Sequence, residues 1–213
     1  MKTRDRITQG ALELFNEHGE PNITTNHIAA HLEISPGNLY YHFRNKEQII
    51  DSIFDAYAND LKYSFSPKAN YSSEELLTYL DAIFMLMWRY RFFYANLPDI
   101  LSRDEHLQEK YLQAQEVSHQ NIVTLLESFR HTGLLSLGDK EMQGLANTLK
   151  LVISCWVAYQ TVQAPKARIT KSVVYQGVLQ VLSIMKPLTT GLGKQRVIEL
   201  ESHYSDQVQQ DLV

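Results

Sequence analysis

Apolar residues recur with helical spacing along almost the whole chain, and no segment alternates as a strand would. The pattern predicts helices at about 3–18, from a cap at Thr24 or Thr25 to Leu32, from Pro36 to Phe43, from Lys46 to a polar break at 64–73, and then at 73–94, 103–132, 139–163 and 170–186, with a polar helix or tail at 194–210. We therefore predict an all-α protein in which the polar break separates a small N-terminal domain from a larger helical body.

The second and third predicted helices are short, and a tight turn at 33–35 joins them. On the third helix Leu39 and Phe43 are spaced i,i+4 and face inward, which leaves its other side polar and exposed. This arrangement, over about residues 24–43, is typical of a helix-turn-helix whose second helix enters the major groove of DNA.

The exposed side of the third helix carries groups suited to DNA. Gly37 permits close approach to a base edge, and Asn38 offers a donor and an acceptor. Tyr40 and Tyr41 combine a flat ring with a hydroxyl. His42 and Lys46 flank the helix, and Thr24 and Thr25 begin the helix before it. An aromatic core cluster is the alternative for the tyrosines, but two adjacent residues of a helix cannot both face one core.

Composition fits a globular protein: the 213 residues are 44% hydrophobic. A single cysteine, Cys155, excludes an internal disulfide and favours a reducing compartment. The N-terminus has no apolar signal segment, and the apolar stretches at 79–88 and 151–159 are shorter than the ~18–20 residues that span a bilayer. We expect a cytoplasmic protein with no membrane partner.

Charge limits how this protein could bind DNA. The chain carries a net charge of −4, and residues 1–50 contain five basic and six acidic side chains, 5 − 6 = −1. Binding must therefore use a few focused contacts, such as helix N-termini and hydroxyls. We expect a modest dependence of affinity on salt.

Residues 4–55 resemble the N-terminal domain of the tetracycline-repressor (TetR) family of transcriptional regulators. The matching residues are Ala11, Leu12, Leu14, Phe15, Gly19, Thr24, Thr25, Ile28, Ala29, Ile34, Ser35, Gly37, Leu39, Tyr40, His42, Phe43, Lys46 and Glu47. Beyond residue 55 only the number, lengths and breaks of the helices agree.

The resemblance implies a nine-helix, two-domain fold that forms a homodimer and binds a palindromic double-stranded operator. The expected domains are 1–62 for DNA binding, 63–190 for ligand binding and dimerisation, and 191–213 as a polar helix or tail. By analogy the DNA-facing residues are Thr25, Ser35, Pro36, Gly37, Asn38, Tyr40, Tyr41, His42 and Lys46.

One residue departs from the family pattern. Glu33 occupies the turn position where glycine is usual, so we expect a left-handed backbone there at a cost of roughly 1 kcal/mol or more. The glutamate also adds negative charge close to DNA.

The body contains two clusters of large side chains, at 84–94 and 155–159. Core packing is the ordinary explanation for such clusters, but the family resemblance favours a cavity for a small hydrophobic effector. The candidate cavity residues are Phe84, Met87, Trp88, Arg91, Cys155, Trp156 and Tyr159. The pair His27 and His31 is only half of a metal site, so no metal or other cofactor is expected.

Two predicted helices within 145–184 have apolar residues on more than one side, which favours a four-helix dimer contact. The residues concerned are Ala146, Leu149, Val152, Ile153, Val174, Val178, Val181 and Leu182.

These features favour a ligand-responsive DNA-binding repressor. In it, the fourth helix would carry a coupling of about 1–3 kcal/mol from effector to operator. The alternative is a protein-partner module of the same fold that has lost DNA binding, which the acidic N-terminal domain and Glu33 favour. An enzyme is not expected, because the chain has no nucleophile motif, phosphate loop or metal spacing.

Overall fold

The computed structural model describes residues 2–64, 67–68, 71, 73–164 and 168–211. These residues form ten α-helices and two short 3₁₀ helices, with no strand beyond one isolated bridge between Leu135 and Thr189. The helices are α1 (Thr3–His18), η1 (Glu20–Asn22), α2 (Thr25–His31), α3 (Pro36–His42), α4 (Lys46–Ser64), α5 (Ser73–Arg89), α6 (Arg91–Ser102), α7 (Glu105–His131), α8 (Asp139–Gln163), α9 (Lys171–Met185), η2 (Lys186–Leu188) and α10 (Gly191–Gln210). The all-α prediction is confirmed. The predicted polar break at 64–73 lies largely outside the described residues.

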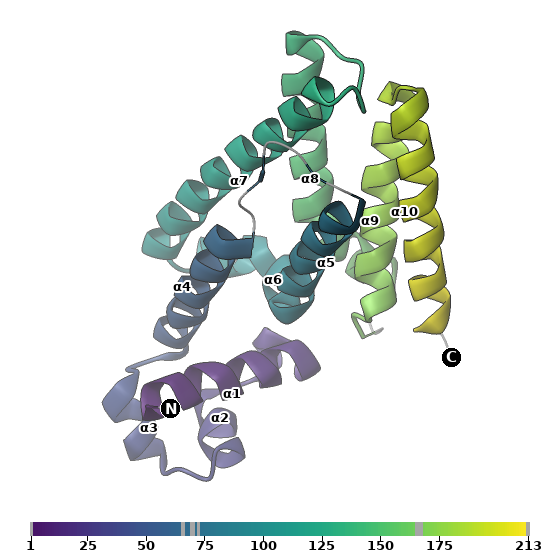
Figure 1. Ribbon diagram of the computed structural model, residues 1–213. Coiled ribbons are helices and arrows are strands. Elements are labelled where there is room, and N and C mark those ends of the chain that lie inside the picture. Colours follow the sequence, from purple (N-terminus) through teal and green to yellow (C-terminus); the bar gives the residue numbers. More distant parts are fainter. Residues whose placement is uncertain (1, 65–66, 69–70, 72, 165–167, 212–213) are drawn as a thin grey trace.

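Helices α1, α2 and α3 form a small unit below the body, and α4 leads from this unit upward (Figure 1). Ile7 and Phe15 of α1, Ile28 of α2 and Leu39 of α3 are almost completely buried together. Gly10 allows α1 and α2 to approach closely, because a Cβ at this position would lie 2.8 Å from Leu32 Cδ2. The buried side chains hold α3 against α1 and α2, each contributing roughly 1.5–3 kcal/mol.

Helices α5 and α6 differ from the prediction of one helix over 73–94 that ends before Pro98. The chain breaks at Tyr90, whose ring is completely buried and whose hydroxyl donates to Asp60 Oδ2 at 2.7 Å. Pro98 lies inside α6, and Asn96, just before it, leaves the helical conformation (φ −129°, ψ 19°). The helix thus accommodates the missing proline N–H by a kink rather than by ending.

The last helix belongs to the body. Val197, Leu200 and Tyr204 share one side of α10 and are buried, and Tyr204 donates to Asp81 Oδ1 of α5 at 2.9 Å. The segment expected as a polar helix or tail is therefore a helix through Gln210, packed along α9 (Figure 1). It is the tenth α-helix in the described residues, one more than the resemblance implied; residues 212–213 lie outside them. None of the described helices combines the length and apolar character needed to cross a membrane.

Candidate nucleic-acid interface and internal cavity

Helix α3 has one buried and one bare side. Leu39 and Phe43 are completely buried, whereas Tyr40 is 47% and Tyr41 85% exposed. The first turn of the helix, residues 36–38, is also exposed. The aromatic residues thus divide: Phe43 belongs to the core, and the two tyrosines face solvent.

Local hydrogen bonds fix the two short helices. The Ser35 hydroxyl accepts from the Asn38 N–H at 3.1 Å and caps α3, while the Thr24 hydroxyl accepts from the His27 N–H at 3.3 Å and caps α2. The hydroxyls of Thr25 and Tyr40 lie 3.0 Å apart and connect the start of α2 to α3. These bonds cap both helices and join the start of α2 to the exposed side of α3.

The turn between α2 and α3 has the strained backbone expected from the sequence. Glu33 has φ 54° and an exposed side chain. Its N–H donates to Ala30 O at 3.2 Å, and the Ile34 N–H donates to Ala29 O at 3.0 Å. The turn therefore closes tightly with glutamate in the left-handed conformation.

Lys46, by contrast, does not face the bare side with a free ammonium. Its Nζ lies 2.7 Å from Glu20 Oε1 and donates to the carbonyl oxygens of Glu20 at 3.1 Å and Ile23 at 3.2 Å. Three protein acceptors thus surround the cation. In this structure the ammonium joins the start of α4 to η1, and the contact between Lys46 and DNA stays a prediction.

Another cation, Arg4, lies beside α3, and the sequence pattern assigned it no role. The Arg4 guanidinium donates to the His42 carbonyl at 3.2 Å and lies 4.2 Å from the centre of the Phe43 ring. His42 itself is half-buried, and Arg44 in the following loop is exposed. No local pattern could have found Arg4, because 38 residues separate it from the carbonyl that it contacts.

The small unit is joined to the body by polar contacts with α6. Arg103 Nη2 lies 2.9 Å from Glu20 Oε2, and hydrogen bonding to Glu20 raises the pKa of Arg103. At the other end of α6, the Phe92 N–H donates to Asn16 Oδ1 at 3.2 Å, and Asn16 Nδ2 donates to Arg89 O at 2.7 Å. Helix α6 is thus bonded at both ends to the segment that begins with α1.

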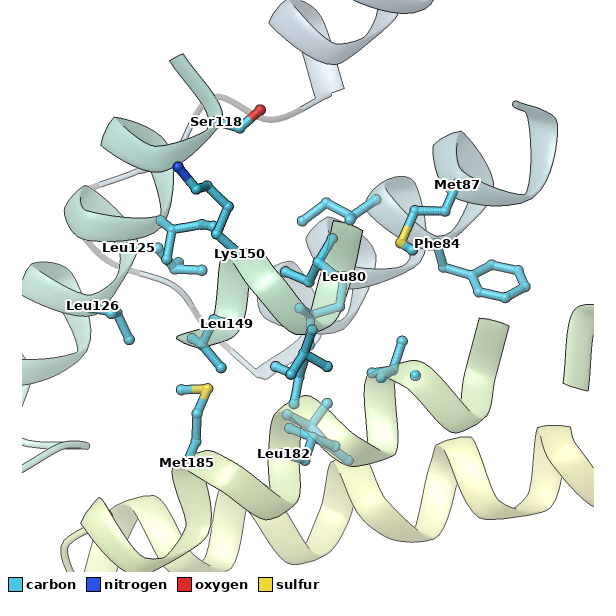
Figure 2. A pocket seen from close by; sticks show the side chains of 18 of the residues that line it. Leu80, Phe84, Met87, Ser118, Leu125, Leu126, Leu149, Lys150, Leu182 and Met185 are labelled. Atoms are coloured by element: carbon cyan, nitrogen blue, oxygen red, sulfur yellow. The ribbon is translucent and has the colours of Figure 1, made fainter. Parts of the chain in front are cut away.

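The body encloses a largely apolar cavity of about 160 Å³ among α4–α10 (Figure 2). Three of the predicted ligand residues, Phe84, Met87 and Trp156, line this cavity. Figure 2 shows Phe84 and Met87 on α5, with Leu182 and Met185 of α9 on another wall.

Four predicted ligand residues, Trp88, Arg91, Cys155 and Tyr159, lie outside the cavity lining, and their contact with a ligand stays a prediction. Arg91 donates to Trp88 O at 3.0 Å, and its guanidinium lies 3.9 Å from the centre of the Trp88 ring. Arg91 Nη2 also donates to Asn16 O at 3.4 Å, so this pair faces the small unit. Cys155 and Tyr159 are exposed on the outer side of α8. The large side chains that are clustered in the sequence at 84–94 and 155–159 therefore point to different sides of their helices.

Most of the residues predicted at the dimer contact line the cavity. Ala146 is completely buried, and the other seven line the cavity: Leu149, Val152, Ile153, Val174, Val178, Val181 and Leu182. The exposed apolar side of α8 instead consists of Leu151, Cys155, Tyr159 and Val162, at i, i+4, i+8 and i+11. The outward side of α8 is therefore a different set of residues from the one predicted.

Sequence reasoning missed the polar groups of the cavity. Tyr57 of α4 and Tyr94 of α6 line it, and their hydroxyls lie 3.1 Å apart. Burial raises the pKa of both phenols. Lys150 of α8 also lines the cavity and extends toward Ser118 of α7 (Figure 2). Among the described residues, no three His, Cys, Asp or Glu side chains are grouped as a metal site.

Comparison with known protein families gives two matches that together cover most of the chain. A family model described as "Bacterial regulatory proteins, tetR family" matches residues 7–53, and one described as "Bacterial transcriptional repressor" matches residues 56–197. The first covers α1–α3 and the start of α4, and the second covers the body that holds the cavity.

Individual proteins agree with these matches. The biofilm operon icaADBC negative transcriptional regulator IcaR of Staphylococcus aureus is 28% identical over 158 residues, which are 72% of this chain and 81% of that protein. A crystal structure of a TetR-family transcriptional regulator from Marinobacter aquaeolei VT8 is 37% identical and covers 96% of this chain and 99% of that chain, with a TM-score of 0.85. SmeT, the repressor of a multidrug efflux pump of Stenotrophomonas maltophilia, shares the fold at 18% identity and a TM-score of 0.59, covering 90% of this chain and 92% of its own.

Proposed function

The chain belongs to the TetR family of bacterial transcriptional regulators, and from that premise we propose that it is a repressor released from a palindromic operator by a small, largely apolar effector. Members of this family are non-enzymatic DNA-binding proteins that act as dimers. The proposed domains are a DNA-binding unit ending near residue 62, close to the end of α4, and an effector-binding and dimerisation body that continues through α10.

The bare side of α3 carries the DNA-binding proposal. Gly37, Asn38, Tyr40 and Tyr41 are exposed there although Leu39, between them, is completely buried. Thr24, Thr25, Ser35, Pro36 and His42 surround this side. Exposed aromatic rings cost free energy in water, so their presence on one short helix favours a surface that a partner covers. Hydroxyls, an amide and helix N-termini suit phosphates and base edges.

Selection of bound fragments from random duplexes, with the chain's own upstream region included, tests DNA binding. In the bound complex, Tyr41→Ala should weaken operator affinity by about tenfold or more, as loss of a base or phosphate contact does. Tyr63→Ala is the matched control, because Tyr63 is also exposed (76%) but lies near the end of α4. If no duplex is retained, or both variants bind equally well, the alternative of a protein-partner module replaces the repressor.

The walls of the cavity support the response to an effector. Tyr57 and Tyr94 come from α4 and α6, which also contact α1 of the DNA-binding unit. A ligand between them would favour particular positions of both helices, and thereby of α3 in each subunit of the dimer. A coupling of about 1–3 kcal/mol corresponds to an operator affinity changed by 5- to 150-fold.

The two arms of the proposal are separable by experiment. Tyr57→Phe removes one hydroxyl from the cavity wall, on α4 rather than on α3, and should alter effector response while operator affinity without effector stays the same. Fluorescence anisotropy of a labelled operator, with and without effector, measures both quantities. An effector that binds the body and leaves operator affinity unchanged would exclude the proposed release.

A further inference from the structure

Among the described residues, the charged side chains that line the cavity are all of one sign. Lys150 and Arg196 are present in this lining, and no described aspartate or glutamate is. Most of the remaining lining is aliphatic or aromatic. Apolar surroundings penalise an unpaired charge on a ligand, so the fixed charges of the wall decide which charged ligands enter.

The two cations are not equivalent. Arg196 Nη1 lies 3.5 Å from Glu199 Oε2 on the same helix, so a carboxylate already accompanies it. Lys150 is half-buried and makes no ion pair with any described residue. Its ammonium extends toward Ser118, whose hydroxyl belongs to the same part of the lining (Figure 2). Of these two cations, Lys150 is thus the one without a counter-charge among the described side chains.

We propose that the effector is a small amphipathic carboxylate, with its apolar part among α5, α8 and α9 and its carboxylate at Lys150. This inference rests on the proposed function, because it names the ligand of the same cavity. When an apolar ligand fills the cavity it displaces water from the Lys150 ammonium. A carboxylate on the ligand replaces that water with a charge-assisted hydrogen bond, whereas an alcohol or an amine does not.

The volume limits the size of the apolar part. A cavity of about 150 Å³ accepts benzene, so the cavity here, about 160 Å³, accommodates an apolar group of roughly six carbon atoms. Met87 and Met185 in the wall are flexible and can make room for a somewhat longer chain. Octanoate is therefore a suitable probe, with 1-octanol and octylamine as probes of equal chain length but different head group.

Calorimetric titration of the full-length protein, without DNA, tests the proposal. Octanoate should bind at least tenfold more tightly than 1-octanol or octylamine. Lys150→Met should weaken octanoate binding by about tenfold to a hundredfold and leave 1-octanol binding unchanged, and Lys150→Arg should retain most of the affinity. The matched control is Lys140→Met, which removes the same charge from an exposed position on the same helix.

Three results would each overturn the carboxylate assignment. These are equal binding of octanoate and 1-octanol, octanoate binding that Lys150→Met leaves unchanged, and no measurable octanoate binding. Loss of octanoate affinity in Arg196→Met but not in Lys150→Met would likewise remove Lys150 from the site. Operator release is measured separately. If octanoate binds through Lys150 without releasing DNA, the proposed function is contradicted but this inference is not. If 1-octanol alone releases DNA, this inference is contradicted but the proposed function is not.

Discussion

Glu20 contacts two cations, Lys46 within the DNA-binding unit and Arg103 of the body, and replacing it tests how the unit is joined to the body. Its side chain is completely buried, with Oε1 2.7 Å from Lys46 Nζ and Oε2 2.9 Å from Arg103 Nη2. Glu20→Gln keeps the shape of the side chain and removes only its charge. Lys46 and Arg103 would then face each other across a neutral amide, without the carboxylate that both contact.

The expected cost follows from the burial of the three groups. Removing one partner of a fully buried ion pair costs about 3–5 kcal/mol, because the other charge is left uncompensated. Here the Lys46 and Arg103 side chains retain 19% and 33% exposure, so water partly compensates them. Arg103 also keeps Asp99 Oδ2 at 3.2 Å and Glu47 Oε1 at 3.9 Å, which lowers the cost further. We therefore expect the free energy of unfolding to fall by about 2–4 kcal/mol, which lowers Tm by about 5–15 °C for a chain of this size.

Urea unfolding followed by far-UV circular dichroism measures this change. Glu17→Gln is the matched control, because it removes the same charge from an exposed position on α1 and should change stability by no more than about 0.5 kcal/mol. The double variant Glu20→Gln/Arg103→Met completes a cycle. Its coupling energy should be about 1.5–3 kcal/mol, the value of a hydrogen bond between charged groups. A Glu20→Gln protein as stable as the control, or a coupling energy near zero, would refute the role given to this cluster.

Three further predictions concern the turn, the outer side of α8 and the buried phenols. Glu33→Gly should raise the free energy of unfolding by about 1 kcal/mol, because glycine adopts a positive φ without strain. Glu33→Ala removes the same charge but keeps the strain, so it should not raise that free energy. Thermal melts of both variants measure the difference. Leu151→Glu should dissociate the dimer, as measured by sedimentation equilibrium. The control Leu112→Glu should not, because Leu112 is similarly exposed but lies on α7. A dimeric Leu151→Glu protein would exclude this side of α8 as the interface. Burial raises the pKa of Tyr57 and Tyr94, and that of Tyr111 to about 12, above the ~10 of an unfolded chain. Because the unfolded state then loses protons first, stability should fall as pH rises above about 10; urea midpoints that stay constant from pH 9 to about 12 would contradict this.

The sequence by itself determined the elements whose signals are local. The helices at Thr3–His18 and Asp139–Gln163 have the predicted bounds, because caps, glycine and proline act on their immediate neighbours. The bare side of α3 was equally predictable, since an i,i+4 pair of apolar residues fixes which side of a short helix is buried. The left-handed conformation of Glu33 followed from its position in the turn.

Only the tertiary structure decided which groups each apolar side packs against and which groups each charged side chain contacts. An apolar stripe is removed from water equally well by a core, a cavity wall or a second subunit, so periodicity could not assign the inward residues of α8 and α9 to the cavity. Likewise, no local pattern indicates which acceptors Lys46 and Arg4 contact within the protein. Lys46 contacts the buried carboxylate of Glu20, and Arg4 donates to the His42 carbonyl at the end of α3. The fold brings these distant segments within hydrogen-bonding distance.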